Sequence, residues 1–336
     1  MHRMKRMRAS VIGAGAWGTA FAIHCARIGA QVMLRAFEPE LVSELNVAKE
    51  NTVFLPGFKM PDSILFTHSI DDALDFADTI VIATPSFALR DTLTPFGQKL
   101  KRKKILVLTK GIERSTFKLM NEIVEEITGS SGGNIASLSG PSFAKEVAQG
   151  LFTAAVVASK DIDFSQALQQ QIHSDYFRVY RIDDIIGVEL GGALKNVMAI
   201  GSGIIDGLRF GMNTQAAFTT RALAEIKRLG KALGAKESTF MGLSGMGDLI
   251  LTSYGSLSRN RVFGIELASG KKARAIIESQ KTVVEGYYTI NAAYNLARKL
   301  GVQMPITEEL YLIAYEGKDI TASLKDIIKR EFKRED

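Results

Sequence analysis

The fold of this chain is decided by the segment Val11-Ile12-Gly13-Ala14-Gly15-Ala16-Trp17-Gly18, which joins an apolar strand to a helix through three glycines. In such a G-x-G-x-x-G sequence, Gly13 makes the tight turn, Gly15 lets the backbone approach a pyrophosphate and Gly18 lets the helix pack closely on the strand. The N-terminus of the following helix offers free N–H groups and positive potential to phosphates. The segment therefore predicts a Rossmann corner that binds a dinucleotide.

Around this corner, short β-branched segments alternate with helical ones. This alternation predicts a parallel sheet covered by helices. The expected strands are Ala9–Ile12, Gln31–Phe37, Ser63–Thr67, Thr79–Ala83, Lys104–Thr109 and Asn134–Ser139, and Thr153–Ala158 and Phe177–Arg181 are expected to extend the sheet. The expected helices include Gly18–Ile28, Leu41–Val47 and Ser115–Glu126.

From about Ile185 onward, strand-like segments nearly vanish and helical patterns replace them. The helices expected there are Ile185–Gly203, Gln215–Leu233, Arg261–Ala268, Val284–Lys299 and Ile306–Tyr315. We therefore expect an α/β fold with a doubly wound parallel sheet over residues 1–190, followed by an all-α domain over residues 191–336. A helical domain at the carboxyl ends of the strands would form a cleft with the Rossmann domain.

The composition is that of a soluble globular protein, with 46% hydrophobic and 23% charged residues among 336. The segment Val197–Leu208 is apolar, but two glycines and Asp206 interrupt it, so we expect no membrane insertion. The single cysteine, Cys25, and the lack of a secretory signal in Met1–Arg8 fit a cytoplasmic protein.

The charges and histidines exclude some kinds of ligand. The net charge of +6 is scattered, and the basic cluster Lys99–Lys104 contains no aromatic residues, so we expect no nucleic-acid partner. A basic excess also suits anionic small molecules such as phosphates. The four histidines show no metal-ligand spacing, and we expect no metal.

Two lysines are candidates for chemistry. Lys110 follows a predicted strand and would point into the ligand crevice. Lys195 lies on a predicted helix that also contains Gly191 and Gly192, and each helical glycine costs about 1 kcal/mol relative to alanine. The missing side chains of these glycines let another segment or a ligand come close to the helix. A lysine beside such a close contact would be partly desolvated, which lowers its pKa and lets it exchange protons near neutral pH. The alternative is tight helix packing with a lysine that extends its charge to the surface.

Three further segments combine turn residues with polar groups. Ser142 follows Gly140-Pro141, and Asp248 follows a glycine-rich turn. Ser258-Arg259-Asn260-Arg261 opens a predicted helix, where arginine and a helix N-terminus suit a phosphate. Taken singly, each segment is also compatible with an ordinary turn or helix cap.

The end of the second strand bears on the choice of coenzyme. An acidic residue there binds the ribose 2′-hydroxyl of NAD, whereas an arginine accommodates the 2′-phosphate of NADP. Here Arg35 favours NADP and the nearby Glu38 favours NAD, so both coenzymes stay open.

Together, these segments resemble the bacterial NAD(P)-dependent glycerol-3-phosphate dehydrogenases along nearly the whole chain. The resemblance rests on residues 13–18, 110–111, 139–146, 187–197, 242–252, 258–261, 284–286 and 304–306. It implies a Rossmann domain followed by a helical domain like that of 6-phosphogluconate dehydrogenase. It also implies a cytoplasmic enzyme that interconverts dihydroxyacetone phosphate and sn-glycerol 3-phosphate with NADP(H) or NAD(H), without a metal, and supplies phospholipid synthesis. A homodimer is compatible with this fold.

The resemblance further implies roles for individual residues. Lys195 matches the family's proton-transferring lysine, with Lys110 and Asp248 beside it as catalytic residues. The positions that match substrate contacts are Lys110, Gly140, Ser142, Lys195, Asp248, Ser258, Arg259 and Asn260. Those that match coenzyme contacts, with the glycine corner included, are Gly13, Gly15, Ala16, Trp17, Gly18, Arg35, Phe37, Lys110, Ala144, Arg259, Val283 and Glu285. The chain departs from the family at Arg35 and Phe37, where tryptophan and then a basic residue are usual.

Two other functions remain as alternatives. One is a β-hydroxyacid dehydrogenase of the wider 6-phosphogluconate dehydrogenase-like group, which also uses a lysine on the first long helix. The segment 258–261 argues for a phosphate end group instead. The other is a non-catalytic NADP-sensing protein, against which Lys110, Lys195 and Asp248 argue.

Overall fold

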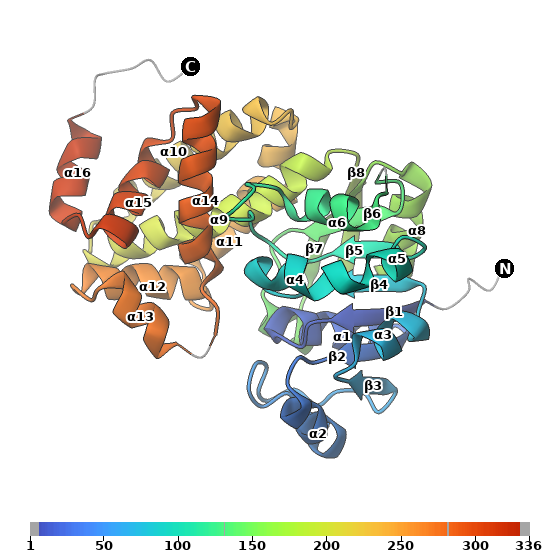
Figure 1. Cartoon of the computed structure of the whole chain (residues 1–336). Helices are drawn as coiled ribbons and strands as arrows, with labels where there is room; N and C mark the ends of the chain where they lie inside the picture. The colour runs from blue at the N-terminus through green and yellow to red at the C-terminus, as the bar shows by residue number, and fades with distance from the viewer. Residues whose placement is uncertain (1–6, 131, 281, 330–336) are drawn as a thin grey trace.

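The computed structural model describes residues 7–130, 132–280 and 282–329, and it has an α/β part followed by a helical part (Figure 1). Its sheet has eight strands in the order β3-β2-β1-β4-β5-β6-β7-β8. The strands are β1 (Arg8–Ile12), β2 (Gln31–Arg35), β3 (Ile64–Thr67), β4 (Thr79–Ile82), β5 (Lys104–Val107), β6 (Ile135–Ser139), β7 (Thr153–Ser159) and β8 (Phe177–Ile182). Every strand predicted from the sequence is confirmed, including the two that extend the sheet.

The expectation of a fully parallel sheet is wrong at one place, because β7 runs antiparallel to β6. The helix between these two strands has only six residues, and a six-residue helix is about 9 Å long. Because it is too short to return the chain along the sheet, β7 starts at the edge where β6 ends. Gly140, with φ of +137°, makes the turn at the end of β6.

Helices cover the sheet and are the main elements of the chain after β8. In the α/β part they are α1 (Ala16–Arg27), α2 (Pro39–Ala48), α3 (Ile70–Phe76), α4 (Leu89–Leu93), α5 (Gly97–Leu100), α6 (Met120–Thr128), α7 (Ala144–Gln149) and α8 (Ile162–Ile172), with the short helical turns η1 (Ser86–Ala88) and η2 (Thr94–Phe96). In the helical part they are α9 (Ile185–Gly207), α10 (Gly211–Ala232), α11 (Asp248–Tyr254), α12 (Arg259–Ala268), α13 (Ala273–Ser279), α14 (Glu285–Leu300), α15 (Pro305–Glu316) and α16 (Ile320–Ile328), with η3 (Glu237–Met241) and the π-helical η4 (Leu243–Gly247).

The helix predicted over Ser115–Glu126 begins later than expected, at Met120. Phe117 has a φ of +63°, which is incompatible with a helix, and Ile112 pairs with Leu119 in an isolated β-bridge. The Glu122 carboxylate accepts the Leu119 N–H at 2.7 Å and so caps the helix start. The local turn therefore overrides the helical pattern before Met120.

Helix α9 is the core of the helical part and lies between the other helices and the sheet (Figure 1). It is long and apolar enough to cross a membrane, with a mean hydropathy of 1.2, but 89% of that segment is buried inside the protein. Its close contact with α12 depends on two glycines. A Cβ on Gly203 would lie 2.0 Å from the Arg261 carbonyl oxygen, and one on Gly264 would lie 2.0 Å from that of Ile200.

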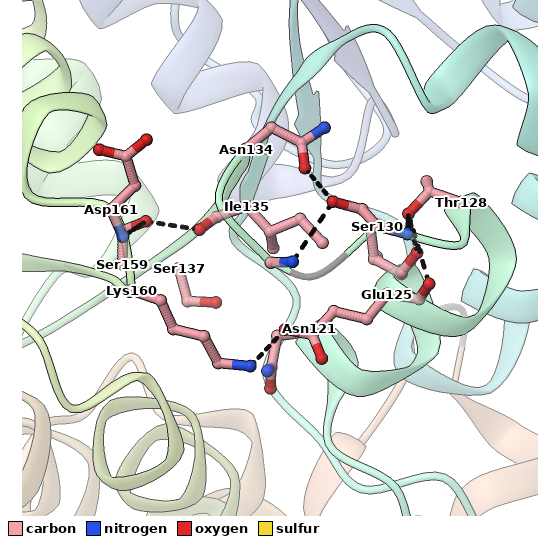
Figure 2. Close-up of polar contacts among 12 residues, drawn as sticks. Asn121, Glu125, Thr128, Ser130, Asn134, Ile135, Ser137, Ser159, Lys160 and Asp161 are labelled. Carbon is pink, nitrogen blue, oxygen red and sulfur yellow. Dashed lines mark hydrogen bonds and ion pairs between the residues drawn. The ribbon is translucent and has the colours of Figure 1, made fainter.

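A buried carboxylate fastens α9 to the sheet. Glu189 accepts the backbone N–H of Asn121, at the start of α6, and the hydroxyl of Ser137 on β6. Figure 2 shows Asn121 and Ser137 on these two elements. Burial raises the pKa of Glu189 to about 7, while its hydrogen bonds oppose that change.

The same view shows contacts that join the end of β7 to β6, and the residue after β7 to α6, at the other end of β6. The Ser159 hydroxyl donates to the Ile135 carbonyl at 2.7 Å, and Lys160 pairs with Glu125 at 2.7 Å (Figure 2). Together with Glu189, these contacts fix β6, whose carboxyl end leads into the candidate site.

Candidate active site

The glycine corner has the geometry that its sequence predicts. Gly13 has a φ of +119°, and a Cβ there would lie 2.6 Å from the Ala83 carbonyl oxygen. A Cβ on Gly18 would lie 2.0 Å from the Gly13 carbonyl oxygen, whereas one on Gly15 would meet nothing within 4 Å. Gly13 and Gly18 therefore serve the turn and the packing, and Gly15 leaves the N-terminus of α1 open to a ligand.

Two polar side chains near this corner fit a dinucleotide. In the described part of the chain, the indole N–H of Trp17 and the hydroxyl of Thr84 are buried without a hydrogen-bond partner. Trp17 follows the first residue of α1, and Thr84 comes directly after β4, the strand that pairs with β1. Buried polar groups usually have partners, so these two donors are consistent with a ligand-binding corner.

The central feature of the site is one carboxylate between two ammonium groups. Lys110 Nζ lies 2.6 Å from Asp248 Oδ2, and Lys195 Nζ lies 2.5 Å from Asp248 Oδ1. Lys110 comes from the loop after β5, Lys195 from α9 and Asp248 from the start of α11. Asp248 is fully buried, and only 11% of the Lys195 side chain is exposed. The structure thus brings together the three residues predicted to be catalytic.

The charges of this triad alter one another's proton affinity. Burial lowers the pKa of Lys195, Asp248 raises it and Lys110 lowers it, with a net value of about 8. Burial raises the pKa of Asp248, but the two lysines outweigh this effect, so the pKa lies below its ordinary value. Asp248 therefore stays ionised near neutral pH, while Lys195 can gain and lose a proton.

Two glycines of α9 allow the triad to assemble. A Cβ on Gly191 would lie 2.5 Å from the carbonyl oxygen of Ser244, which is in the turn before Asp248. A Cβ on Gly192 would lie 2.8 Å from the hydroxyl oxygen of Ser139, the last residue of β6, and 3.4 Å from the Lys110 side chain. Their cost to the helix is thus explained by close contact with the turn before Asp248 and with the end of β6.

Around the triad, Thr252 donates to the Asp248 carbonyl at 2.7 Å. Lys110 donates to the Gly140 carbonyl at 3.4 Å, and Ser142 donates to the same oxygen at 2.9 Å. Gly140 and Ser142 therefore lie next to Lys110, as predicted, and Ala144 follows as the first residue of α7.

The predicted phosphate-binding residues lie at the start of α12. Ser258 caps this helix by accepting the Arg261 N–H at 3.2 Å, and Arg261 itself pairs with Asp206 at 2.5 Å. Asn260 donates to Asn196, the residue after Lys195, at 2.9 Å. The helix start is thereby connected to the triad.

The start of α14 lies against the same region. The Asn260 side-chain oxygen accepts the N–H of Gly286 at 2.9 Å. Glu285, the first residue of α14, accepts the N–H and the hydroxyl of Ser86 at 3.1 and 2.5 Å. Val283 lies in the loop just before this helix. Glu285 therefore joins the helical part to the loop after β4.

Arg35 and Phe37 lie apart from the triad, at the end of β2. The Arg35 Nε donates to the His68 carbonyl at 3.0 Å, and its guanidinium lies 5.4 Å from the centre of the Phe37 ring. Phe37 is 74% exposed, and the exposed Glu38 is the N-cap of α2. Arg35 and Phe37 are thus neighbours in space. They hold the two positions at which the sequence departs from the family pattern.

The sequence interpretation missed Ser86, which contacts a predicted coenzyme residue. A signal was available, because Thr84-Pro85-Ser86 follows β4 in the same way as Lys110 follows β5. The side chains at the carboxyl ends of adjacent parallel strands meet at one edge of the sheet.

A Rossmann corner, together with a buried lysine–carboxylate triad shared between the sheet and a helical domain, is typical of NAD(P)-dependent dehydrogenases. The family models for the N-terminus and the C-terminus of NAD-dependent glycerol-3-phosphate dehydrogenase match residues 8–165 and 184–325. The chain therefore belongs to the NAD-dependent glycerol-3-phosphate dehydrogenase family.

Individual relatives agree with this assignment. The chain is 45% identical to the glycerol-3-phosphate dehydrogenase [NAD(P)+] of Geobacter sp. (strain M21) over 97% of this chain and 98% of that protein. It is 43% identical to that of Bartonella tribocorum over 99% of this chain and 100% of the relative. The crystal structure of glycerol-3-phosphate dehydrogenase from Coxiella burnetii has a TM-score of 0.92 at 36% identity and covers 97% of this chain and 99% of its own. Of the three functions that the sequence left open, the family supports glycerol-3-phosphate dehydrogenase.

We expect the variant Asp248→Asn to lower the pKa of Lys195 below about 8, because the attraction that raises it is lost while Lys110 still repels it. The alkaline limit of the pH profile for dihydroxyacetone phosphate reduction then moves to lower pH, and kcat falls at least about tenfold. Initial rates between about pH 6 and about pH 10, on either side of the Lys195 pKa of about 8, measure this shift.

Thr252→Val is the matched control, since it removes the hydroxyl that donates to the Asp248 backbone carbonyl at 2.7 Å and to its carboxylate at 3.4 Å but keeps all three charges. It should move the alkaline limit less than Asp248→Asn does. An unchanged limit in Asp248→Asn would show that the carboxylate does not control the proton affinity of Lys195.

Proposed function

We propose that Lys195 is the proton-transferring residue of this protein, an NAD(P)-dependent oxidoreductase that interconverts sn-glycerol 3-phosphate and dihydroxyacetone phosphate. Its product supplies phospholipid synthesis. The observation that carries the proposal is the buried contact of Lys195 with Asp248, whose second oxygen contacts Lys110. An ammonium group with a pKa of about 8 can donate and recover a proton under ordinary conditions.

In the direction of ketone reduction, protonated Lys195 donates to the C2 oxygen as negative charge develops there. Lys110 adds positive charge near that oxygen, and this charge stabilises the transition state more than the neutral ketone. Asp248 holds the two ammonium groups in place despite their repulsion. In the reverse direction, neutral Lys195 accepts the proton of the C2 hydroxyl.

The glycine corner is the proposed seat of the coenzyme, whose nicotinamide supplies or accepts the hydride when it is bound. The residues assigned to coenzyme binding, besides the three corner glycines, are Ala16, Trp17, Arg35, Phe37, Lys110, Ala144, Arg259, Val283 and Glu285. The described residues contain no group of three or more histidine, cysteine, aspartate or glutamate side chains that could hold a metal ion.

The substrate phosphate is assigned to Ser258, Arg259 and Asn260. Arginine binds phosphate with two parallel hydrogen bonds, and the N-terminus of the ten-residue helix α12 adds positive potential. Asn260 gives one amide hydrogen to Asn196 and keeps the other for a ligand. Gly140 and Ser142 complete the substrate site beside Lys110. A cytoplasmic location and a homodimer remain predictions.

Lys195→Ala should reduce kcat for dihydroxyacetone phosphate reduction by about 10²–10⁴-fold, the usual contribution of a general acid. In the unmodified protein the reduction rate should fall as pH rises through about 8, because only protonated Lys195 donates, and the oxidation rate should rise over the same interval. Steady-state assays in both directions measure these changes.

Lys271→Ala, which removes a mostly exposed lysine, is the control and should leave kcat unchanged. Coenzyme binding, followed by fluorescence titration, should persist in Lys195→Ala. Near-normal turnover of Lys195→Ala would rule out the assigned role.

The coenzyme preference depends on Arg35 in this proposal. The Nη groups of Arg35 can bind the 2′-phosphate of NADPH while its Nε donates to His68. Arg35→Ala should therefore raise the KM for NADPH about tenfold and change that for NADH much less. Arg35→Lys, which keeps a positive charge, should have a smaller effect. Equal changes in both KM values would contradict this role.

A further inference from the structure

We propose that Ser86 is a positioning residue, which holds the carboxylate of Glu285 and thereby keeps the guanidinium of Arg259 available to an anionic ligand. Ser86 belongs to the Rossmann part, whereas Glu285 and Arg259 open two helices of the helical part. The inference rests on the proposed role of Arg259 in binding phosphate. It assigns a function in the reaction to a residue outside the predicted site.

The first observation is that Ser86 binds both oxygens of the Glu285 carboxylate. The Ser86 N–H donates to Oε1 at 3.1 Å, and its hydroxyl donates to Oε2 at 2.5 Å. Ser86 is only 5% exposed. Burial raises the pKa of Glu285, whereas the two bonds from Ser86 and the charge of Arg259 oppose that change. Ser86 thus stabilises the ionised carboxylate in one orientation.

The second observation is that the turn bearing Ser86 is held firmly. A Cβ on Gly111 would lie 2.4 Å from the Ser86 Cβ, so the loop after β5 packs directly against this side chain. The Phe87 ring lies 5.6 Å from the ring of Tyr288, which follows Glu285 by about one helical turn. The Arg114 guanidinium lies over the same Tyr288 ring, at 5.1 Å from its centre. Ser86 therefore cannot follow the carboxylate if it turns away.

The third observation is that the helix starts bearing Arg259 and Glu285 adjoin each other. Asn260 and Gly286, the residues that follow them, are hydrogen-bonded at 2.9 Å. Burial lowers the pKa of Arg259, and the charge of Glu285 opposes this effect, so the two charged groups attract each other. Among residues 7–130, 132–280 and 282–329, however, Arg259 forms no ion pair within 4.0 Å, and it is an exposed residue.

These observations describe a competition for one carboxylate. A direct pair between Arg259 and Glu285 would occupy the planar N–H fork through which arginine binds phosphate. The Ser86 hydroxyl and N–H satisfy the carboxylate instead, and the fork stays free. Without the hydroxyl, the carboxylate keeps one bond to Ser86 and can turn towards Arg259. The ligand phosphate would then have to displace it.

The test is the KM for dihydroxyacetone phosphate at saturating coenzyme. Ser86→Ala should raise this KM about tenfold and change kcat much less, because the triad is untouched. In the double variant Ser86→Ala/Glu285→Gln, the KM should equal that of Glu285→Gln alone, since a neutral side chain does not compete for Arg259. Thermal unfolding of each variant checks that the fold is kept.

Other outcomes would overturn the proposal. One such outcome is that Ser86→Ala leaves the KM unchanged. Another is that Ser86→Ala raises the KM by the same factor whether residue 285 is Glu or Gln. In either case Ser86 does not act through the carboxylate. Arg259→Gln, measured in parallel, separates this failure from failure of the proposed function. If Arg259→Gln raises the KM but Ser86→Ala does not, only the role of Ser86 is overturned. No increase with Arg259→Gln overturns the phosphate-binding role of Arg259 as well.

Discussion

The site depends on one buried carboxylate that contacts two ammonium groups. Without Asp248, Lys110 and Lys195 would repel each other in a place where little water can screen them. Without the lysines, a fully buried Asp248 would be protonated or displaced. Each member thus makes the ionisation of the others possible. The excess positive charge that remains is the feature that a developing alkoxide needs.

This charge arrangement explains why the two parts of the chain are joined so closely. Lys110 comes from the sheet, whereas Lys195 and Asp248 come from the helical part. Any shift between the parts would separate the charges. Glu189 resists such a shift by binding α6 and β6 from within α9, and Glu285 does so on the other side by binding Ser86. Glu189 is buried and Glu285 is half-buried, and each joins the helical part to the α/β part through hydrogen bonds.

Much of the fold could be predicted from the sequence, because its signals are local. The glycine corner, the eight strands and the long helices follow from turn residues and hydrophobic patterns along the chain. The antiparallel β7 could not be predicted in this way, since its direction depends on how far the short α7 carries the chain. The late start of α6 was also missed, because a bridge between Ile112 and Leu119 outweighs the helical pattern there.

The site was predictable in part. Lys195 stood out because two glycines weaken its helix, and the structure explains both by close contacts with Ser244 and Ser139. The pairing of Lys110 with Asp248 joins residues 138 positions apart, and only the resemblance to a family indicated it. Ser86 escaped notice although it follows β4 as Lys110 follows β5, because a serine after a proline is also an ordinary turn residue. Its importance appears only when Glu285, 199 residues later, is placed against it.

The most direct test of this account is the proton affinity of Lys195 in the intact protein. A titration by NMR of ¹³Cε-labelled lysine, with Lys195→Arg to assign the signal, measures it without any reaction. The account predicts a pKa of about 8. A value near the ordinary 10.5 would contradict it, because Lys195 would then be neither desolvated nor influenced by Lys110.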